Sequence, residues 1–137
     1  MLKNSKKYVK KIDSTNIYDV VIKSPITFAE NISLSTKNKI YLKREDLQPT
    51  HSFKIRGAYN KIKTLVSKQS VKHVVTASAG NHAQGVAYSA RTLKIKATIF
   101  MPRTTPTIKI DEVKKMKSKV MLVGDNFDEA LDAALKF

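Results

Sequence analysis

The sequence contains no cysteine, only four glycines and no long apolar run. The absence of cysteine excludes disulfides and thiolate chemistry, and it fits a protein of the cytosol, where disulfides are rare. No stretch approaches the roughly 20 apolar residues that a helix needs to cross a bilayer. The N-terminus is charged and polar, without the apolar centre of a secretory signal. We therefore expect a cytoplasmic protein that has no membrane-spanning segment.

Positive charge is the strongest bias in the composition. Of the 137 residues, 26 are Lys or Arg and 11 are Asp or Glu, which gives a formal net charge of +15. A basic nucleic-acid-binding module is one interpretation, because such residues neutralise phosphates. However, 22 of the 26 are lysines spread along the whole chain, whereas proteins that recognise phosphates and base edges favour arginine. We therefore expect no nucleic-acid partner.

The N-terminal third has few periodic segments. Residues 1–16 are Lys-rich and polar, and we expect a loose lead-in there. A short apolar segment at 17–22 (IYDVVI) is ended by the Ser24-Pro25 step. Residues 40–43 (IYLK) predict a strand, and a charged cluster at 44–46 follows it directly. In α/β proteins such a cluster often lies at the edge of the ligand cleft.

From residue 52 onward, helical and strand patterns alternate. Apolar residues at three- and four-residue spacing predict helices, and short β-branched runs predict buried strands. In chain order we expect a helix at 52–66, a strand at 73–77, a helix at 83–90, a strand at 97–101, a helix at 107–117, a strand at 119–123 and a helix at 127–135. Successive βαβ units require a parallel sheet with right-handed crossovers. The expected fold class is therefore α/β with a parallel sheet.

The turn after the strand at 73–77 is the first candidate site. Ser78-Ala79-Gly80-Asn81 leads into a helix, and the free N–H groups of a helix N-terminus bind anions. Ser78 adds a hydroxyl, Asn81 adds an amide, and Gly80 permits close approach to the backbone. An ordinary βα turn with an N-cap has the same pattern, so spacing alone leaves both interpretations open.

Lys54 is the second candidate, at the start of a predicted helix between Phe53 and Ile55. Partial desolvation there would lower the pKa of the amine and favour the neutral nucleophile that imine formation requires. A surface lysine at a helix start is the alternative, because lysine is so frequent in this chain. The local sequence alone does not separate the two.

Two long stretches, REDLQPTHSFKIRGA at 44–58 and TASAGNHAQGVA at 76–87, together resemble the fold-type II pyridoxal-phosphate enzymes, and within them the serine/threonine dehydratases. The segments IYDVVIKSPIT, IYLKRED, TIFMP and VGDNFDEA resemble the same family in the same order, so the resemblance spans residues 17–135. It implies the tryptophan synthase β-like fold, incomplete in this chain. The pattern Gln-Pro-x-His-Ser-Phe-Lys at 48–54 is similar to the biosynthetic threonine dehydratases. Catabolic serine/threonine dehydratases and serine racemases remain the alternatives.

The resemblance also implies roles for individual residues. Lys54 is expected to hold pyridoxal 5′-phosphate as a Schiff base and to act as the base at the substrate Cα. Asn81 is expected to hydrogen-bond the ring oxygen of the cofactor, and Phe53 to pack near its ring. His51 and Arg56 are expected to be supporting residues that fix the loop, and no metal is implied. The substrate carboxylate is expected at the turn made by Ser78, Ala79, Gly80, Asn81 and His82.

The implied reaction is β-elimination of L-threonine to 2-oxobutanoate and ammonia, the first step toward isoleucine, with L-serine as a possible second substrate. The family's Gly-rich phosphate loop, the Ser or Thr facing the pyridine nitrogen and the regulatory domain have no counterpart in this sequence. The last helical pattern also lacks a stop signal. We therefore expect residues 17–137 to be the N-terminal part of the catalytic region, the start of the large domain plus most of the small one. The complete enzyme is expected to be a homotetramer, and the short chain to have little or no activity.

Overall fold

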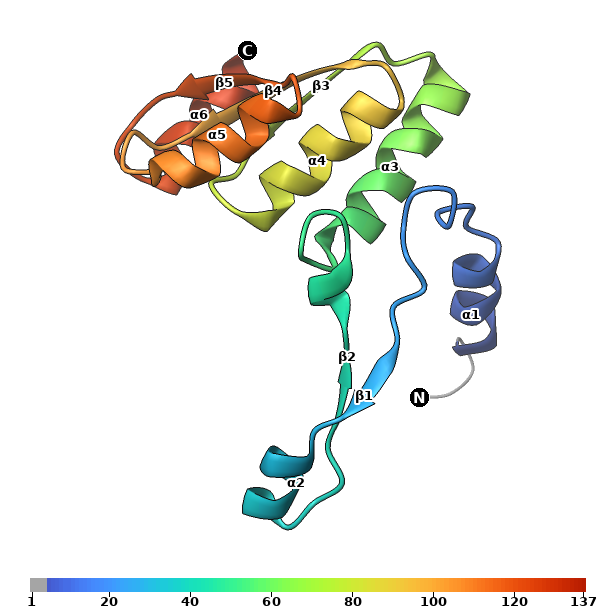
Figure 1. Cartoon of the computed structure of the whole chain (residues 1–137). Helices are drawn as coiled ribbons and strands as arrows, with labels where there is room; N and C mark the ends of the chain where they lie inside the picture. Colours follow the sequence, from blue (N-terminus) through green and yellow to red (C-terminus); the bar gives the residue numbers. More distant parts are fainter. Residues whose placement is uncertain (1–4) are drawn as a thin grey trace.

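The computed structural model describes residues 5–137. Figure 1 shows a layered C-terminal part and an N-terminal part that extends away from it. No helix among the described residues is long and apolar enough to span a membrane. The elements in chain order are α1 (Ser5–Asp13), β1 (Ile26–Phe28), α2 (Glu30–Thr36), β2 (Tyr41–Lys43), the 3-10 helix η1 (Glu45–Leu47), α3 (Lys54–Gln69), β3 (His73–Ala77), α4 (Asn81–Thr92), β4 (Lys96–Met101), α5 (Thr107–Lys115), β5 (Lys119–Leu122) and α6 (Phe127–Lys136).

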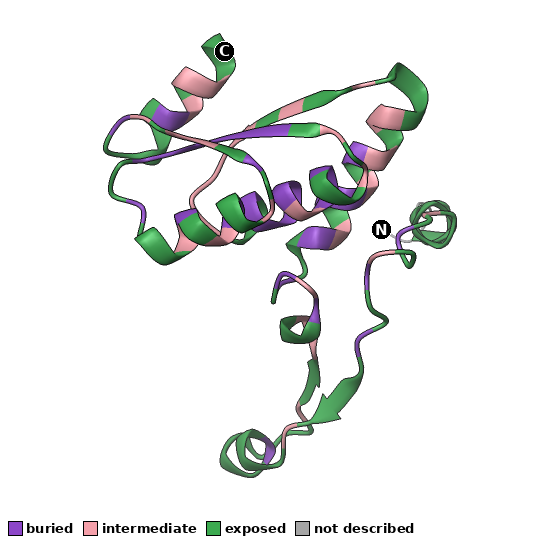
Figure 2. Ribbon diagram, turned by 45° about the horizontal axis from the view of Figure 1, so that its top comes forward, coloured by how far each residue is buried: buried purple, intermediate pink, exposed green. Residues whose placement is uncertain are grey.

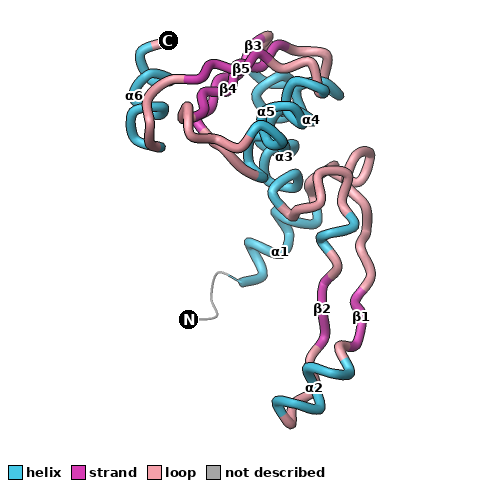
Figure 3. Tube along the Cα trace, turned by 60° about the vertical axis from the view of Figure 1, so that its left-hand side comes forward, coloured by secondary structure: helices cyan, strands magenta, loops and turns pink. Residues whose placement is uncertain are grey.

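The C-terminal part contains the parallel sheet that the alternating pattern predicts. Its strand order is β3-β4-β5, with β4 paired in parallel to both neighbours. Figure 3 shows α6 on one face of the sheet and α4 and α5 on the other. Helices on both faces bury the central strand, and five of the six residues of β4 are buried. The predicted α/β class with βαβ units is confirmed.

The main core lies between β4 and the helices α4 and α5. Ile99 and Met101 of β4 are completely buried, and so is Val113 of α5. Alanines at 83 and 87 face them from α4, and their small side chains allow that helix to lie close to the sheet. This packing fixes the N-terminal end of α4, where the predicted anion site lies.

The N-terminal part contains an exposed arm, which we define as residues 26–43. Its strands β1 and β2 pair antiparallel, with Thr27 opposite Leu42, and α2 connects them. Every residue of both strands is exposed, and Figure 2 shows the contrast with the sheet. The strand expected at 40–43 is confirmed, but β1 and α2 were not expected. Strand β1 buries no residue and α2 buries only Ser33, so neither has a buried apolar face that a sequence pattern could show.

The loose lead-in expected for residues 1–16 is wrong for the part that the structure describes. Ser5–Asp13 forms helix α1, and residues 1–4 lie outside the described residues. Tyr8, Val9 and Ile12 share one side of α1 but are all more than half exposed. This helix buries no residue. Its three apolar residues lie among lysines, so the sequence pattern did not predict a helix there.

Candidate active site

Helix α3 begins at Lys54, two residues later than the sequence pattern suggested. Ser52 is buried, and its Oγ accepts the backbone N–H of Lys54 at 3.3 Å. Within the part of the chain that the structure describes, the Lys54 side chain is exposed. The expected partial desolvation of its amine is therefore wrong. Its Nζ lies 5.2 Å from the centroid of the Phe53 ring, which is itself 59% exposed. The amine is therefore accessible and lies over an accessible aromatic ring.

The N-terminus of α4 has free hydrogen-bond donors. Ser78 Oγ accepts the backbone N–H groups of Gly80 at 3.4 Å and Ala83 at 3.2 Å. Among residues 5–137, the backbone N–H groups of Asn81 and His82 have no acceptor. A Cβ added to Gly80 would meet nothing within 4 Å, so the space in front of the helix is open. The turn can therefore receive an anion at two backbone donors and the positive end of the helix dipole.

A close contact between α3 and α4 brings the two candidate segments together. A Cβ added to Gly85 of α4 would lie 3.3 Å from the backbone of both Lys54 and Ile55. Although His82 is exposed, desolvation of its ring lowers its pKa, and the positive charge of Lys54 lowers it further. The Lys54 amine thus acts on the first turn of α4, as the predicted site requires.

Asn81 lines a surface depression of about 390 Å³ beside this turn. His51 and Gln84 line it together with three residues of α5: Ile108, Lys109 and Glu112. His51 has a left-handed backbone with φ 51°, and its Nδ1 lies 3.1 Å from the carbonyl oxygen of Asp46. This contact agrees with the loop-fixing role expected for His51, and a ligand can reach the Asn81 amide.

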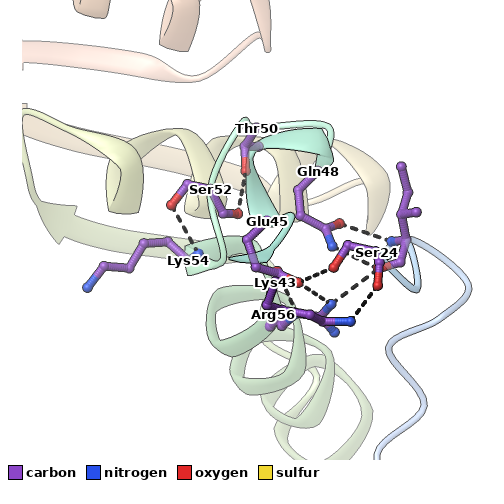
Figure 4. Close-up of polar contacts among 9 residues, drawn as sticks. Ser24, Lys43, Glu45, Gln48, Thr50, Ser52, Lys54 and Arg56 are labelled. Carbon is purple, nitrogen blue, oxygen red and sulfur yellow. Dashed lines mark hydrogen bonds and ion pairs between the residues drawn. The ribbon is translucent and has the colours of Figure 1, made fainter. Parts of the chain in front are cut away.

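Behind Lys54 lies a polar cluster, which we call the Glu45 network and define as Ser24, Lys43, Glu45, Gln48 and Arg56 (Figure 4). Arg56 donates from Nε to Glu45 Oε2 and from its Nη2 to Oε1, both at 2.7 Å. Ser24 Oγ donates to the same Oε1 at 2.5 Å. The hydrogen bonds from Arg56 are the largest cause that lowers the pKa of Glu45, to about 2. Glu45 is therefore a carboxylate at any physiological pH.

Gln48 attaches this network to the segment before the arm. Its side chain is 1% exposed, and it exchanges two hydrogen bonds with the backbone of Ile22. Ile22 N–H donates to Oε1 at 3.0 Å, and Nε2 donates to the Ile22 carbonyl at 2.7 Å. Arg56 donates to the same carbonyl at 3.2 Å. Residues 22–24, 43–48 and the first turn of α3 are therefore joined by directional contacts.

Sequence reasoning expected Arg56 to support the loop, but it missed Glu45, Gln48 and Gly85. Glu45 lies in η1 and Arg56 in α3, and the periodicity of one element does not predict a contact with another. The one available signal for Gly85 was a glycine inside a helical pattern, which often marks a close packing contact.

The fold and this geometry define a class of protein: an α/β domain that presents a free amine beside a helix N-terminus able to bind an anion. The family model of the "Pyridoxal-phosphate dependent enzyme" matches residues 17–137, and the chain belongs to this family. Its cofactor is pyridoxal phosphate. The incomplete fold-type II architecture expected from the sequence is confirmed.

Named relatives narrow the comparison. The mitochondrial threonine dehydratase of Schizosaccharomyces pombe is 55% identical over 124 residues, which are 90% of this chain and 20% of that protein. The solved structure of the processed form of threonine deaminase isoform 2 from Solanum lycopersicum has a TM-score of 0.89 at 46% identity, covering 99% of this chain and 38% of that one. Maize serine racemase has a TM-score of 0.85 at 30% identity, with coverage of 95% and 39%. The chain thus spans about a fifth of the curated relative's length.

Proposed function

We propose that these residues contribute the lysine-bearing half of the active site of a biosynthetic threonine dehydratase. The reaction is β-elimination of L-threonine to 2-oxobutanoate and ammonia, the first step toward isoleucine. The observation that supports the proposal is the α3–α4 contact at Gly85, where the backbone of Lys54 meets the helix that begins with the Asn81 turn. The greater identity to threonine deaminase than to serine racemase supports the choice of substrate.

Each residue has one task in this proposal. Lys54 would hold the cofactor and then accept the proton from the substrate Cα at its Nζ. Asn81 would donate to the ring oxygen of the cofactor, and Phe53 would pack near the ring. The turn at 78–82 would receive the substrate carboxylate on the N–H groups of Asn81 and His82. The cofactor supplies the electron withdrawal that makes the Cα–H bond acidic.

The described residues fit this cofactor at one end. They provide an exposed primary amine at Lys54, an accessible amide at Asn81 and open space at Gly80. No two of the four glycines are closer than five residues along the chain, so they offer no clustered loop for the phosphate. We therefore expect little or no activity from the 137 residues alone. Threonine-dependent release of 2-oxobutanoate by the purified chain would contradict this expectation.

The lysine assignment is tested by trapping. The chain is incubated with pyridoxal phosphate, reduced with borohydride, digested and mapped by mass spectrometry. We expect Lys54 to carry more label than Lys61, an exposed lysine on the same helix. Lys54→Ala should remove the preferred label, whereas Lys61→Ala, the matched control, should leave it. Equal labelling of Lys54 and Lys61 would overturn the assignment.

Serine dehydration or racemisation is the second candidate, and the likeness to maize serine racemase favours it. Turnover of threonine and serine by a polypeptide with the complete catalytic region separates these possibilities. A nucleic-acid-binding role would require an affinity for DNA or RNA that falls steeply with salt.

A homotetramer and a cytoplasmic location complete the proposal. The Schizosaccharomyces pombe relative is named mitochondrial, which makes a mitochondrial location the alternative. Sedimentation of the complete enzyme tests the homotetramer, and imaging of a tagged protein tests the cytoplasmic location.

A further inference from the structure

We infer that Glu45 and Arg56 are positioning residues for Lys54, because their two-point ion pair fixes the orientation of the first turn of α3. The inference rests on the proposed function only in assigning Lys54 to the cofactor. The contacts that carry it are those of the Glu45 network, which Figure 4 shows behind the Lys54 backbone.

The direction of the side chains separates positioning from direct contact. Residues two positions apart on an α-helix project about 200° from each other, because each residue turns the helix by about 100°. Figure 4 accordingly shows Lys54 pointing away from the network and Arg56 pointing into it. Arg56 therefore cannot reach a ligand held at the Lys54 amine, yet both side chains leave the same helical turn.

Apolar packing alone does not fix this turn. Ile55 is completely buried and packs with Ile17, Val21 and Tyr59. Such contacts hold the helix against its neighbours, but they define one orientation less sharply than hydrogen bonds do. The planar guanidinium of Arg56 on both Glu45 oxygens is directional, because two parallel hydrogen bonds define one orientation.

The other partners hold Glu45 in place. Ser24 is 5% exposed, and it donates to Glu45 itself. Gln48 is 1% exposed, and it donates to the carbonyl of Ile22, which also accepts a hydrogen bond from Arg56. The Glu45 and Arg56 side chains are themselves 17% and 24% exposed. Removing one of them leaves a largely shielded charge without its partner, so the local structure must rearrange. The first turn of α3, with Lys54, is the part that moves.

The test compares Arg56→Ala with the conservative Arg56→Lys and Glu45→Gln in the 137-residue chain. Arg103→Ala is the matched control, because the Arg103–Asp125 pair is largely exposed. Two quantities are measured: the ratio of borohydride-trapped label on Lys54 to that on Lys61, and amide hydrogen exchange at residues 54–57. We expect Arg56→Ala to lower the labelling ratio of Lys54 to Lys61 about tenfold. Amide hydrogen exchange at residues 54–57 should become about tenfold faster. Arg56→Lys should give intermediate values, and Arg103→Ala should match the wild type.

The outcomes separate this inference from the proposed function. Equal labelling of Lys54 and Lys61 in the wild type sinks the lysine assignment, and exchange at 54–57 then decides the positioning role. A folded Arg56→Ala chain with wild-type exchange overturns the inference, whatever its labelling. If Arg56→Ala does not fold, Arg56→Lys and Glu45→Gln carry the same comparison against Arg103→Ala, and wild-type exchange in both overturns the inference.

Discussion

The parallel sheet and the exposed arm are held in place by different forces. In β4 five of six residues are buried, whereas every residue of β1 and β2 is exposed. The sheet is stabilised by apolar burial, which is strong but non-directional. The segments before and after the arm are joined to each other by the hydrogen bonds between Gln48 and Ile22, and to α3 by the ion pair of Glu45 with Arg56. Lys54 lies where the two kinds of structure meet, and so it depends on both.

The largest difference between the two regions should appear in stability. Ile99→Ala removes a completely buried side chain from β4, and we expect it to lower the free energy of unfolding by about 2–5 kcal/mol. Ile26→Ala is the control in β1, where the side chain is 66% exposed, and it should change stability by less than about 0.5 kcal/mol. Urea unfolding followed by circular dichroism measures both. If Ile99→Ala unfolds the chain, Ile99→Val should still cost about 1 kcal/mol. Equal losses of unfolding free energy for Ile26→Ala and Ile99→Ala would contradict the difference between the buried strand β4 and the exposed strand β1.

The same contrast explains what the sequence could predict. The bounds of the strand His73–Ala77 were predicted to the residue from its β-branched run, but the predicted burial is wrong, because none of its residues is buried. The strand β1 and helix α2 went unpredicted, since exposed residues are under no packing constraint that a pattern could display. Helix α1 was missed for the same reason: its apolar face contacts nothing that buries it.

The candidate site divides in a similar way. Lys54 and Asn81 could be found only through the motifs around them, because the residues alone left both interpretations open. The expectation of a desolvated amine failed since Lys54 lies at an exposed helix start, a property of tertiary structure. The Glu45–Arg56 pair joins two separate elements, η1 and α3, so only the folded structure reveals it.

The second prediction concerns the directional contacts and their dependence on pH. The pKa of Glu45 falls from 4.5 to about 2 in the folded chain, so its stabilisation is complete above about pH 4.5 and is lost as the pH falls through about 2. We expect Glu45→Gln to cost about 2 kcal/mol at pH 7. The difference from wild type should shrink steadily below pH 4.5, as urea unfolding at pH 7, 4 and 3 will measure.

An exposed carboxylate provides the control for this titration. Asp125 pairs with Arg103 at the surface, where water screens the pair, so Asp125→Asn should lower stability at pH 7 far less than Glu45→Gln does. A Glu45→Gln deficit that stays constant from pH 7 to pH 3 would mean that the lost stability does not come from the charge of Glu45.

The third prediction tests the contact that joins the two regions. Alanine is favoured over glycine inside a helix by about 1 kcal/mol, but a Cβ at Gly85 would lie 3.3 Å from the backbone of Lys54 and Ile55. Overpacking costs about 1–3 kcal/mol, so we expect Gly85→Ala to lower stability by about 1 kcal/mol net and to reduce trapping at Lys54. Gly57→Ala is the matched control in α3, because its added Cβ meets nothing within 4 Å. That variant should raise the midpoint of thermal unfolding, and the same sign for both glycines would refute the close contact.

The smallest loss of stability is expected for a hydrogen bond at the surface of the sheet region, the N-terminal cap of α6. Asn126 Oδ1 accepts the backbone N–H of Glu129 at 3.0 Å and so caps α6, which covers the sheet opposite α4. We expect Asn126→Ala to cost about 1 kcal/mol, because it leaves that N–H to water alone, and Asn126→Asp to keep most of the stability. This loss should leave the label on Lys54 unchanged, unlike the loss from Glu45→Gln. Two variants that both lose stability would then differ in their effect on the site, which would separate stability from position. An Asn126→Ala chain that also lost its label on Lys54 would show that the trapping follows overall stability, and the positioning role of Glu45 would lose its support.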